Sequence, residues 1–277
     1  MRGLIVISAR CGFALLLGSG TLLGQAPSDI VTGTQATRRF AYRAKPVHPF
    51  CLDFPFEGSS RKHPVALETC TDTKVPFAAS DSGWIGAQYP AAERRGSISY
   101  RVLAATGNRF LVATEIQGGG SGEFTNLFWA RLGDRQISVD SDLAGGDRCA
   151  GGLSGYTMDG TTLRFNVSTP ARDILRLAGA KVSDSILDRF EPGYTSCDGE
   201  AAYRYDLATR RMVLSGLTLS GEQSSRNSGS LGDVARETQA CFDTVVRRYV
   251  RNRSRTLTPR ELKGFGRSFT ARCAHEP

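Results

Sequence analysis

The chain has 277 residues, of which 40% are hydrophobic and 22% charged, and its formal net charge is +8. This composition is ordinary for a globular protein and excludes a collagen-like or low-complexity chain. The charge is uneven, because residues 236–277 carry ten basic and four acidic side chains whereas residues 27–235 carry 23 of each. A neutral body therefore precedes a basic C-terminal segment.

The N-terminus has the layout of a secretory signal peptide. Arg2 and Arg10 precede an apolar stretch from Phe13 to Leu23, which small residues follow up to Ala26. A membrane span needs about 20 apolar residues and this stretch offers about half of that, so we expect cleavage after Ala26 and not anchoring. The sequence predicts an exported protein, periplasmic or extracellular, without a transmembrane segment after signal cleavage.

Removal of the signal peptide, residues 1–26, leaves six cysteines. Widely spaced cysteines in even number predict disulfides in an exported chain. Six cysteines allow fifteen pairings, and we favour the pairing of neighbours: Cys51 with Cys70, Cys149 with Cys197, and Cys241 with Cys273. A metal site is the alternative, but the chain has no CxxC pair and only three histidines: His48, His63 and His275. We expect neither a metal nor a cofactor.

Residues 27–39 are polar and aperiodic, which predicts a flexible arm before a β-rich domain at 40–220. Proline residues exclude a long helix between 40 and 56. Alternating apolar residues on both sides of short turns then predict successive hairpins. The turns lie at 106–108, at 133–134, at Asp159-Gly160 and near Ala208.

Helical signals follow the third hairpin and return at the C-terminus. Thr169 as N-cap and Pro170 at the first position predict a short helix that ends at Gly179. A Ser/Gly-rich connector at 221–233 leads to a basic helical hairpin at 234–277, whose second helix begins with a capping box from Thr258 to Glu261. The fold class predicted is mainly β with α: an antiparallel β-sandwich or barrel-like sheets followed by a C-terminal helical hairpin.

Three glycine-rich stretches resemble those of uncharacterised bacterial secreted β-rich proteins. They are GGGSGEF at 118–124, GGDRCAGG at 145–152 and DGTTLRF at 159–165. The resemblance covers about 60 of the 277 residues. It implies a β-rich fold and export, and no activity.

The motifs weighed for chemistry are weak. No G-x-S-x-G pattern exists, because Ser154 lies one residue short of it, and the histidines are read as surface or structural residues. Asp147 and Arg148 form either a local ion pair or part of a pocket for a polar ligand. Carboxylates that could serve a hydrolase without histidine are Glu115, Glu123, Asp134, Asp140, Asp142 and Asp147.

The arginines of the C-terminal segment are the strongest pointer to a partner. Five of them lie within nine residues: Arg247, Arg248, Arg251, Arg253 and Arg255. They either offset the dipole of the preceding helix or contact an anionic partner, of which nucleic acid is the least expected outside the cytoplasm. The leading hypothesis is an exported binding protein that contacts an anionic envelope component or another protein. The alternatives are a carboxylate-dependent hydrolase of envelope polymers and an inhibitor of secreted hydrolases.

Overall fold

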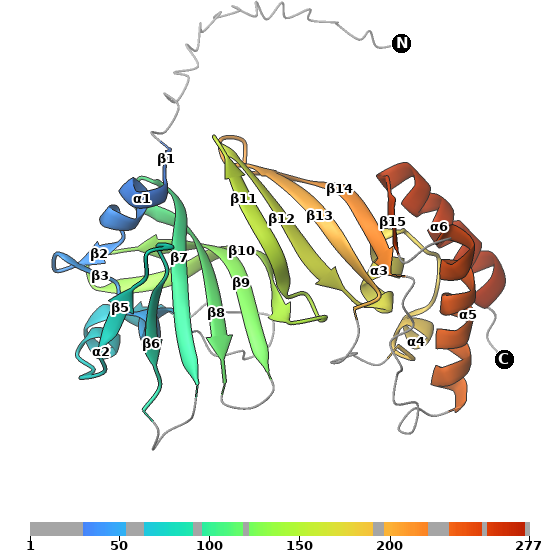
Figure 1. Ribbon diagram of the computed structural model, residues 1–277, viewed down its shortest axis with the longest axis horizontal. Helices are drawn as coiled ribbons and strands as arrows, with labels where there is room; N and C mark the ends of the chain where they lie inside the picture. Colours follow the sequence, from blue (N-terminus) through green and yellow to red (C-terminus); the bar gives the residue numbers. More distant parts are fainter. Residues whose placement is uncertain are drawn as a thin grey trace, which may run out of the picture.

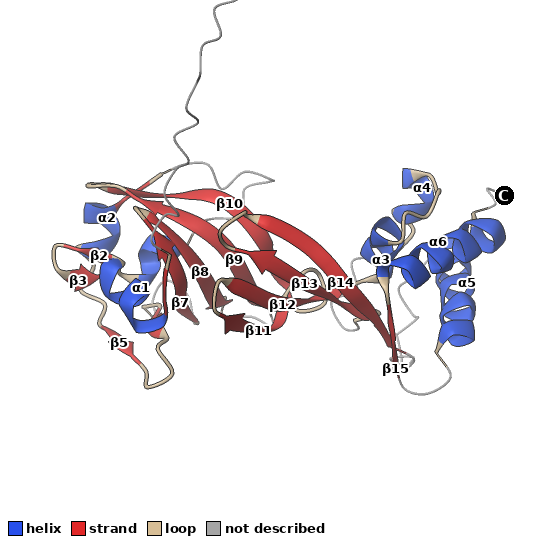
Figure 2. Cartoon of the chain, turned by 90° about the horizontal axis from the view of Figure 1, so that it is seen from above, coloured by secondary structure: helices blue, strands red, loops and turns tan. Residues whose placement is uncertain are grey.

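The fold is mainly β, with two antiparallel sheets followed by C-terminal helices, as predicted (Figure 1). The computed structural model describes residues 30–53, 64–90, 96–118, 122–190, 197–220, 233–250 and 254–274. Outside these residues lie the predicted signal peptide, most of the connector predicted at 221–233, and His63, Arg251, Arg253 and His275. The last residue of that connector, Asp233, begins α5 (Asp233–Tyr249). Helices gather at both ends of the molecule, and the strands run between them (Figure 2).

The first sheet is curled and has the order β4-β10-β9-β8-β7-β6-β5, with β1 paired to β7. The hairpins predicted at 97–117 and 124–141 are confirmed as β7–β8 and β9–β10, and β10 extends beyond the predicted end to Asp147. The strands of this sheet are β1 (Val31–Thr32), β4 (Val65–Ala66), β5 (Phe77–Ala79), β6 (Ile85–Gln88), β7 (Ser97–Thr106), β8 (Arg109–Gln117), β9 (Glu123–Leu132) and β10 (Gln136–Asp147).

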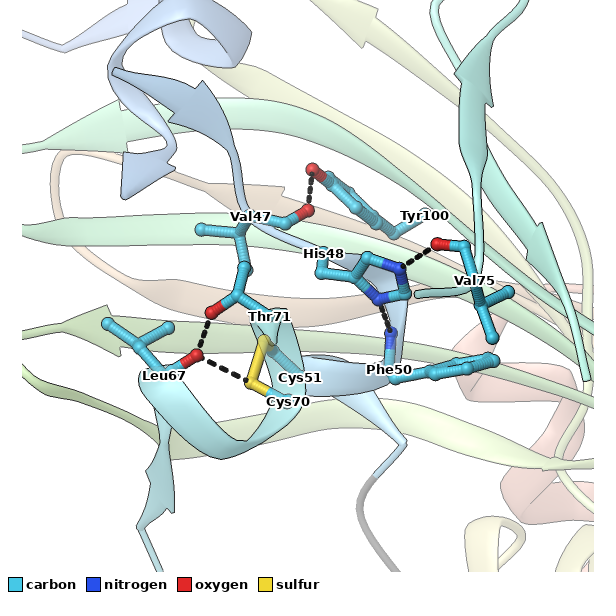
Figure 3. Close-up of a disulfide and its surroundings, with 9 residues drawn as sticks. All are labelled: Val47, His48, Phe50, Cys51, Leu67, Cys70, Thr71, Val75 and Tyr100. Atoms are coloured by element: carbon cyan, nitrogen blue, oxygen red, sulfur yellow. Dashed lines mark hydrogen bonds between the residues drawn. A yellow bond between two sulfur atoms is a disulfide. The ribbon is translucent and has the colours of Figure 1, made fainter. Parts of the chain in front are cut away.

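Short elements cover one face of this sheet and close its core. These are α1 (Gly33–Arg39), the strand pair β2 (Ala41–Tyr42) and β3 (Lys45–Pro46), the 3-10 helix η1 (Pro49–Leu52) and α2 (Leu67–Thr71). Phe40, Cys51 and Leu67 are fully buried against the sheet. The buried Tyr100 hydroxyl donates to the Val47 carbonyl at 2.7 Å, which fixes the covering chain to β7 (Figure 3).

The prediction of a flexible arm at 27–39 is wrong for residues 31–39, because these residues form β1 and α1. Val31 pairs with Ala105 of β7, and Ala36 is fully buried in the core below α1. Only this one residue of the helix is buried, so the sequence has no apolar periodicity there to signal a helix.

The second sheet has the order β11-β12-β13-β14-β15. Its strands are β11 (Leu153–Asp159), β12 (Thr162–Thr169), β13 (Gly199–Asp206), β14 (Arg211–Ser220) and β15 (Ser254–Leu257). Both predicted hairpins are confirmed, and Gly160 adopts the positive φ of 57° that its turn requires. β15, which the sequence analysis did not foresee, joins the C-terminal segment to the sheet.

A shared core holds the two sheets together. Leu111 and Trp129 of the first sheet pack with Leu163, Phe165 and Tyr205 of the second, all at most 3% exposed. The Trp129 indole Nε1–H donates to the Tyr205 hydroxyl at 2.9 Å across this core. The sheets therefore form one continuous packed unit (Figure 2).

The C-terminal helices pack on the far end of the second sheet (Figure 1). They are α3 (Ala171–Leu177), α4 (Asp184–Leu187), α5 (Asp233–Tyr249) and α6 (Pro259–Cys273). The capping box at Thr258 and Glu261 is confirmed. The N-cap of α3 is Pro170 and not Thr169 as predicted, because the Asp198 carboxylate accepts the Ala171 N–H at 2.9 Å.

All three predicted disulfides are confirmed. The Cα–Cα distances are 5.1 Å for Cys51–Cys70, 4.7 Å for Cys149–Cys197 and 5.9 Å for Cys241–Cys273. The first ties η1 to α2, the second ties the loop between the sheets to the start of β13, and the third ties α5 to α6. Each bridge therefore braces a different part of the fold.

Candidate functional site

The end of β10 and the loop 148–152 join the two sheets, and they hold Asp147 and Arg148 in a local arrangement. The Asp147 Oδ1 atom accepts the Glu123 N–H at 3.0 Å and the Arg148 Nε–H at 3.4 Å. The Asp147 side chain is only 11% exposed. A Cβ atom at Gly152 would lie 2.5 Å from the Arg148 carbonyl oxygen, so the tight turn needs this glycine. The geometry therefore supports the local ion pair, and ligand binding by the pair stays a prediction.

The basic C-terminal segment predicted from the sequence presents exposed cations on two helices. Arg247 and Arg248 are exposed at the end of α5, and Arg260, Lys263 and Arg267 are exposed on α6. The spacing i, i+3, i+7 places the three α6 residues on one side of that helix, away from its buried residues Leu262, Phe265 and Phe269. We call these five cations the α5–α6 basic surface.

The two helices are held rigidly, and Arg255 takes part in this. Its guanidinium donates to the Tyr249 carbonyl at 3.3 Å and to Glu261 at 2.7 Å, so it links the end of α5 to the start of α6. Arg255, which the sequence analysis grouped with the exposed arginines, thus has a structural role. The Tyr249 hydroxyl lies 3.2 Å from Ser268 Oγ, and the disulfide fixes the other end of the helix pair.

The candidate carboxylates separate into structural and surface groups. Asp140 forms ion pairs with Arg109 and Arg131, the latter at 2.7 Å. Asp134 lines a cavity of about 560 Å³ beside Glu68, whose carboxylate already contacts Arg43 at 2.8 Å and Arg135 at 3.3 Å. Asp142 is exposed on β10. These three acids do not share a site.

Glu115 and Glu123 are two predicted acids that the structure brings together, with Asp147 bound to the Glu123 N–H on the other side. Glu115 pairs in register with Thr125, and Glu123 with Gln117, so the two glutamates are diagonal neighbours on the same face of β8 and β9. Burial raises the pKa of Glu115, and the nearby charge of Glu123 raises it further. The sequence could not reveal this pair, because the register across the loop between the strands decides it.

Arg101 and Tyr156 extend the same polar region from both sheets. Arg101 lies on β7 in register with Ala113, one step along the face from Glu115. The pKa of Tyr156 on β11 is raised mainly by burial, with Arg101 opposing the shift and the charge of Glu115 adding to it. An acid, a cation and a phenol therefore meet where the two sheets diverge.

A groove of about 810 Å³ lies beside this region on β5, β6 and β7. Gly86 pairs with Ser99, which pairs in turn with Glu115, so two lining residues of the groove are in register with the acid. A Cβ atom at Gly86 would lie 3.3 Å from Ser99 Cβ, so larger side chains would fill the floor. The groove was not predicted from the sequence, because the only sequence signal for it is small residues at alternating positions of short strands.

His48 has a structural position below the first sheet (Figure 3). Its Nδ1 atom accepts the Phe50 N–H at 3.2 Å, which leaves Nε2 to donate to the Val75 carbonyl at 3.1 Å. The ring packs edge-on against Phe50 and Phe77. Burial lowers the pKa of His48, against a smaller opposing effect of the Val75 hydrogen bond. A neutral imidazole with both nitrogens engaged fits the expectation of a structural histidine.

The described part of the chain also bears on metal binding, on membrane-spanning helices and on a serine nucleophile. There, no three or more His, Cys, Asp or Glu side chains gather in a way that could hold a metal ion. Of the described helices, none is long and apolar enough to cross a membrane. Ser154 donates to Glu200 at 2.5 Å. Residues 119–121 of the GGGSG run lie outside the described residues.

Comparison of the chain with protein families, with curated proteins and with solved structures finds no match.

Proposed function

We propose that this chain is an exported binding protein whose α5–α6 basic surface contacts an anionic component of the cell envelope. The observation that carries the proposal is the stripe of Arg260, Lys263 and Arg267 on a helix that a disulfide and a buried core hold in place. Guanidinium groups bind phosphate and carboxylate through paired hydrogen bonds, so a fixed row of them suits a surface of repeated anions.

The helix dipole does not account for this stripe. Cations stabilise a helix near its C-terminus, and Arg247 and Arg248 are placed there in α5. Arg260 and Lys263 instead lie in the first two turns of α6, where the dipole opposes positive charge. Glu261, the acid next to them, is already bound by Arg255 and Thr258. A partner that carries negative charge gives these residues a function that helix stability does not.

Export is supported by the disulfides. Three bridges are typical of proteins that fold in an oxidising compartment, and all six cysteines that remain after removal of residues 1–26 take part in them. The signal-peptide layout of the leader agrees with this location. An envelope component is therefore the kind of anion that the protein would meet.

Charge reversal on α6 tests the proposal. The variant Arg260→Glu/Lys263→Glu/Arg267→Glu is compared with native protein for binding to phosphatidylglycerol vesicles, lipopolysaccharide and an anionic wall polymer. Each cation near an anionic surface contributes about 1 kcal/mol, so binding should weaken by about a hundredfold or more. The matched control, Arg38→Glu/Lys45→Glu/Lys74→Glu, makes the same charge change near the opposite end of the molecule. The proposal is contradicted if the α6 variant and the control variant lose binding equally, or if the α6 variant loses no binding to any of the three probes.

The Glu115–Glu123 pair favours a second function, carboxylate-dependent hydrolysis of an envelope polymer. Two neighbouring carboxylates can divide the roles of general acid and general base. Glu115, with its raised pKa, would act as the acid. Turnover assays on peptidoglycan and glycans test this, with Glu115→Gln and Glu123→Gln expected to abolish activity and Asp142→Asn expected to retain it. Activity that survives both glutamine substitutions rules out the pair.

A further inference from the structure

An uncovered sheet edge lies on β14, far from the α5–α6 basic surface. β15 pairs only with residues 217–220 of β14, from Leu217 opposite Leu257 to Ser220 opposite Ser254. Among the described residues, no strand pairs with Arg211–Gly216 on this side. We call this segment the β14 edge. Figure 1 shows β15 beside only the α6 end of β14, whose other end runs to the hairpin tip.

The sequence explains why the pairing stops there. After Leu257 the chain reaches the N-cap Thr258, and Pro259 starts α6, which directs the backbone away from β14. A Cβ atom at Gly216 would lie 3.2 Å from the Leu257 carbonyl oxygen, so the last pairing is already close. Outward N–H and C=O groups of a free strand edge form a template for another strand.

The β14 edge is also unusually apolar for an exposed strand. Met212 is 45% and Val213 39% exposed, and in the described part of the chain no other large apolar side chain is as open to solvent. Met212 is in register with Tyr205 and Leu163, both buried between the sheets. An added strand would cover Met212 and extend that core.

The opposite face of the same strands is positively charged. Arg164, Arg204 and Val213 are cross-strand neighbours in one row, and Arg211 lies two residues from Val213 on the same face. Arg164 and Arg204, directly opposite each other, repel. Two acids share this face: Asp206 lies opposite Arg211 and already accepts hydrogen bonds from Thr209, and Asp159 forms a distant pair with Arg164 at 4.0 Å. Three arginines therefore meet two acids, and the remaining positive charge favours a negatively charged neighbour.

We infer that the β14 edge binds an extended acidic peptide segment of a partner protein, which adds as a sixth strand to the second sheet. Its backbone pairs with Arg211–Gly216, its acidic side chains lie on the face of Arg204 and Arg211, and its alternate apolar side chains cover Met212. A second copy of this chain fits less well, because antiparallel edge-to-edge pairing would place the arginines of both copies on the same side of the joined sheet.

The test uses defined peptides of about six residues, a usual strand length. A peptide that alternates Glu and Val is compared with a Lys–Val peptide and with a Glu–Val peptide that is N-methylated on one edge. We expect the Glu–Val peptide to bind and to slow hydrogen exchange at the amides of Met212–Ser215. N-methylation removes two or three hydrogen bonds and should weaken binding about tenfold or more.

Protein variants separate this surface from the α5–α6 basic surface. Arg204→Glu/Arg211→Glu should weaken Glu–Val binding about tenfold or more, whereas the α6 triple reversal should leave it unchanged. The inference is overturned if no peptide slows exchange on β14, if the Lys–Val peptide binds as tightly, or if N-methylation has no effect. Self-association that Val213→Lys abolishes would also overturn it, by identifying a second copy as the occupant.

Discussion

The hydrogen bond between Trp129 and Tyr205 connects the two sheets, and its removal gives a sharp prediction about stability. The indole Nε1–H donates to the Tyr205 hydroxyl at 2.9 Å, with Trp129 fully buried and Tyr205 3% exposed. Tyr205→Phe keeps the ring and removes only the acceptor. The buried N–H is then left without a partner, which costs about 1–3 kcal/mol.

Urea denaturation of the purified, oxidised protein measures this cost. We expect Tyr205→Phe to lower the free energy of unfolding by about 2 kcal/mol, within the range for an unsatisfied buried donor. Tyr203→Phe on the same strand is the control, because the Tyr203 ring stacks on Phe165 and the change should alter stability by less than about 0.5 kcal/mol. A Tyr205→Phe variant as stable as the native protein would refute the hydrogen bond between Trp129 and Tyr205.

Three further predictions concern other parts of the fold. Gly266→Ala should destabilise the protein by about 1–3 kcal/mol, because the new Cβ would lie 2.5 Å from the Ala178 carbonyl oxygen. Gly264→Ala should instead stabilise α6 by about 1 kcal/mol, because the nearest atom to its Cβ is 3.7 Å away. Thermal melts in which the two variants shift alike would contradict this packing. Cys241→Ser/Cys273→Ser opens a loop with a sequence separation of 32 and should cost about 3–4 kcal/mol, measured by urea unfolding against the oxidised native protein. His48 has a lowered pKa, so the unfolded chain binds more protons than the folded one below pH of about 6.5, and stability should fall as the pH drops through that value. His48→Gln should flatten this dependence in melts between neutral and mildly acidic pH, and an unchanged slope argues against burial of the imidazole.

Local signals made much of the fold predictable from the sequence. The Asp159-Gly160 turn and the capping box at Thr258 depend on residues close together in the chain, and each disulfide joins cysteines that are consecutive in the sequence. Contacts distant in sequence were not accessible in this way. β15 has only four residues, and its pairing with β14 crosses a whole helix. Neither its composition nor its periodicity could show that pairing.

The features of the candidate sites also divide into those that the sequence predicts and those that it does not. The exposed arginines of α5 could be predicted, because charge clusters are visible in the sequence, whereas the role of Arg255 in clamping two helices could not. The proximity of Glu115 and Glu123 depends on strand register. The β14 edge depends on where a neighbouring strand stops. These features arise from topology, which local sequence patterns do not encode.

The central claim is that the chain acts outside the cytoplasm in an oxidised form. Mass spectrometry of the intact protein, isolated without reduction from the cells that make it, tests this most directly. The account predicts a mature chain that starts at Pro27 and holds its six cysteines in three bridges. A chain that retains Met1 and carries free thiols at these positions would contradict it.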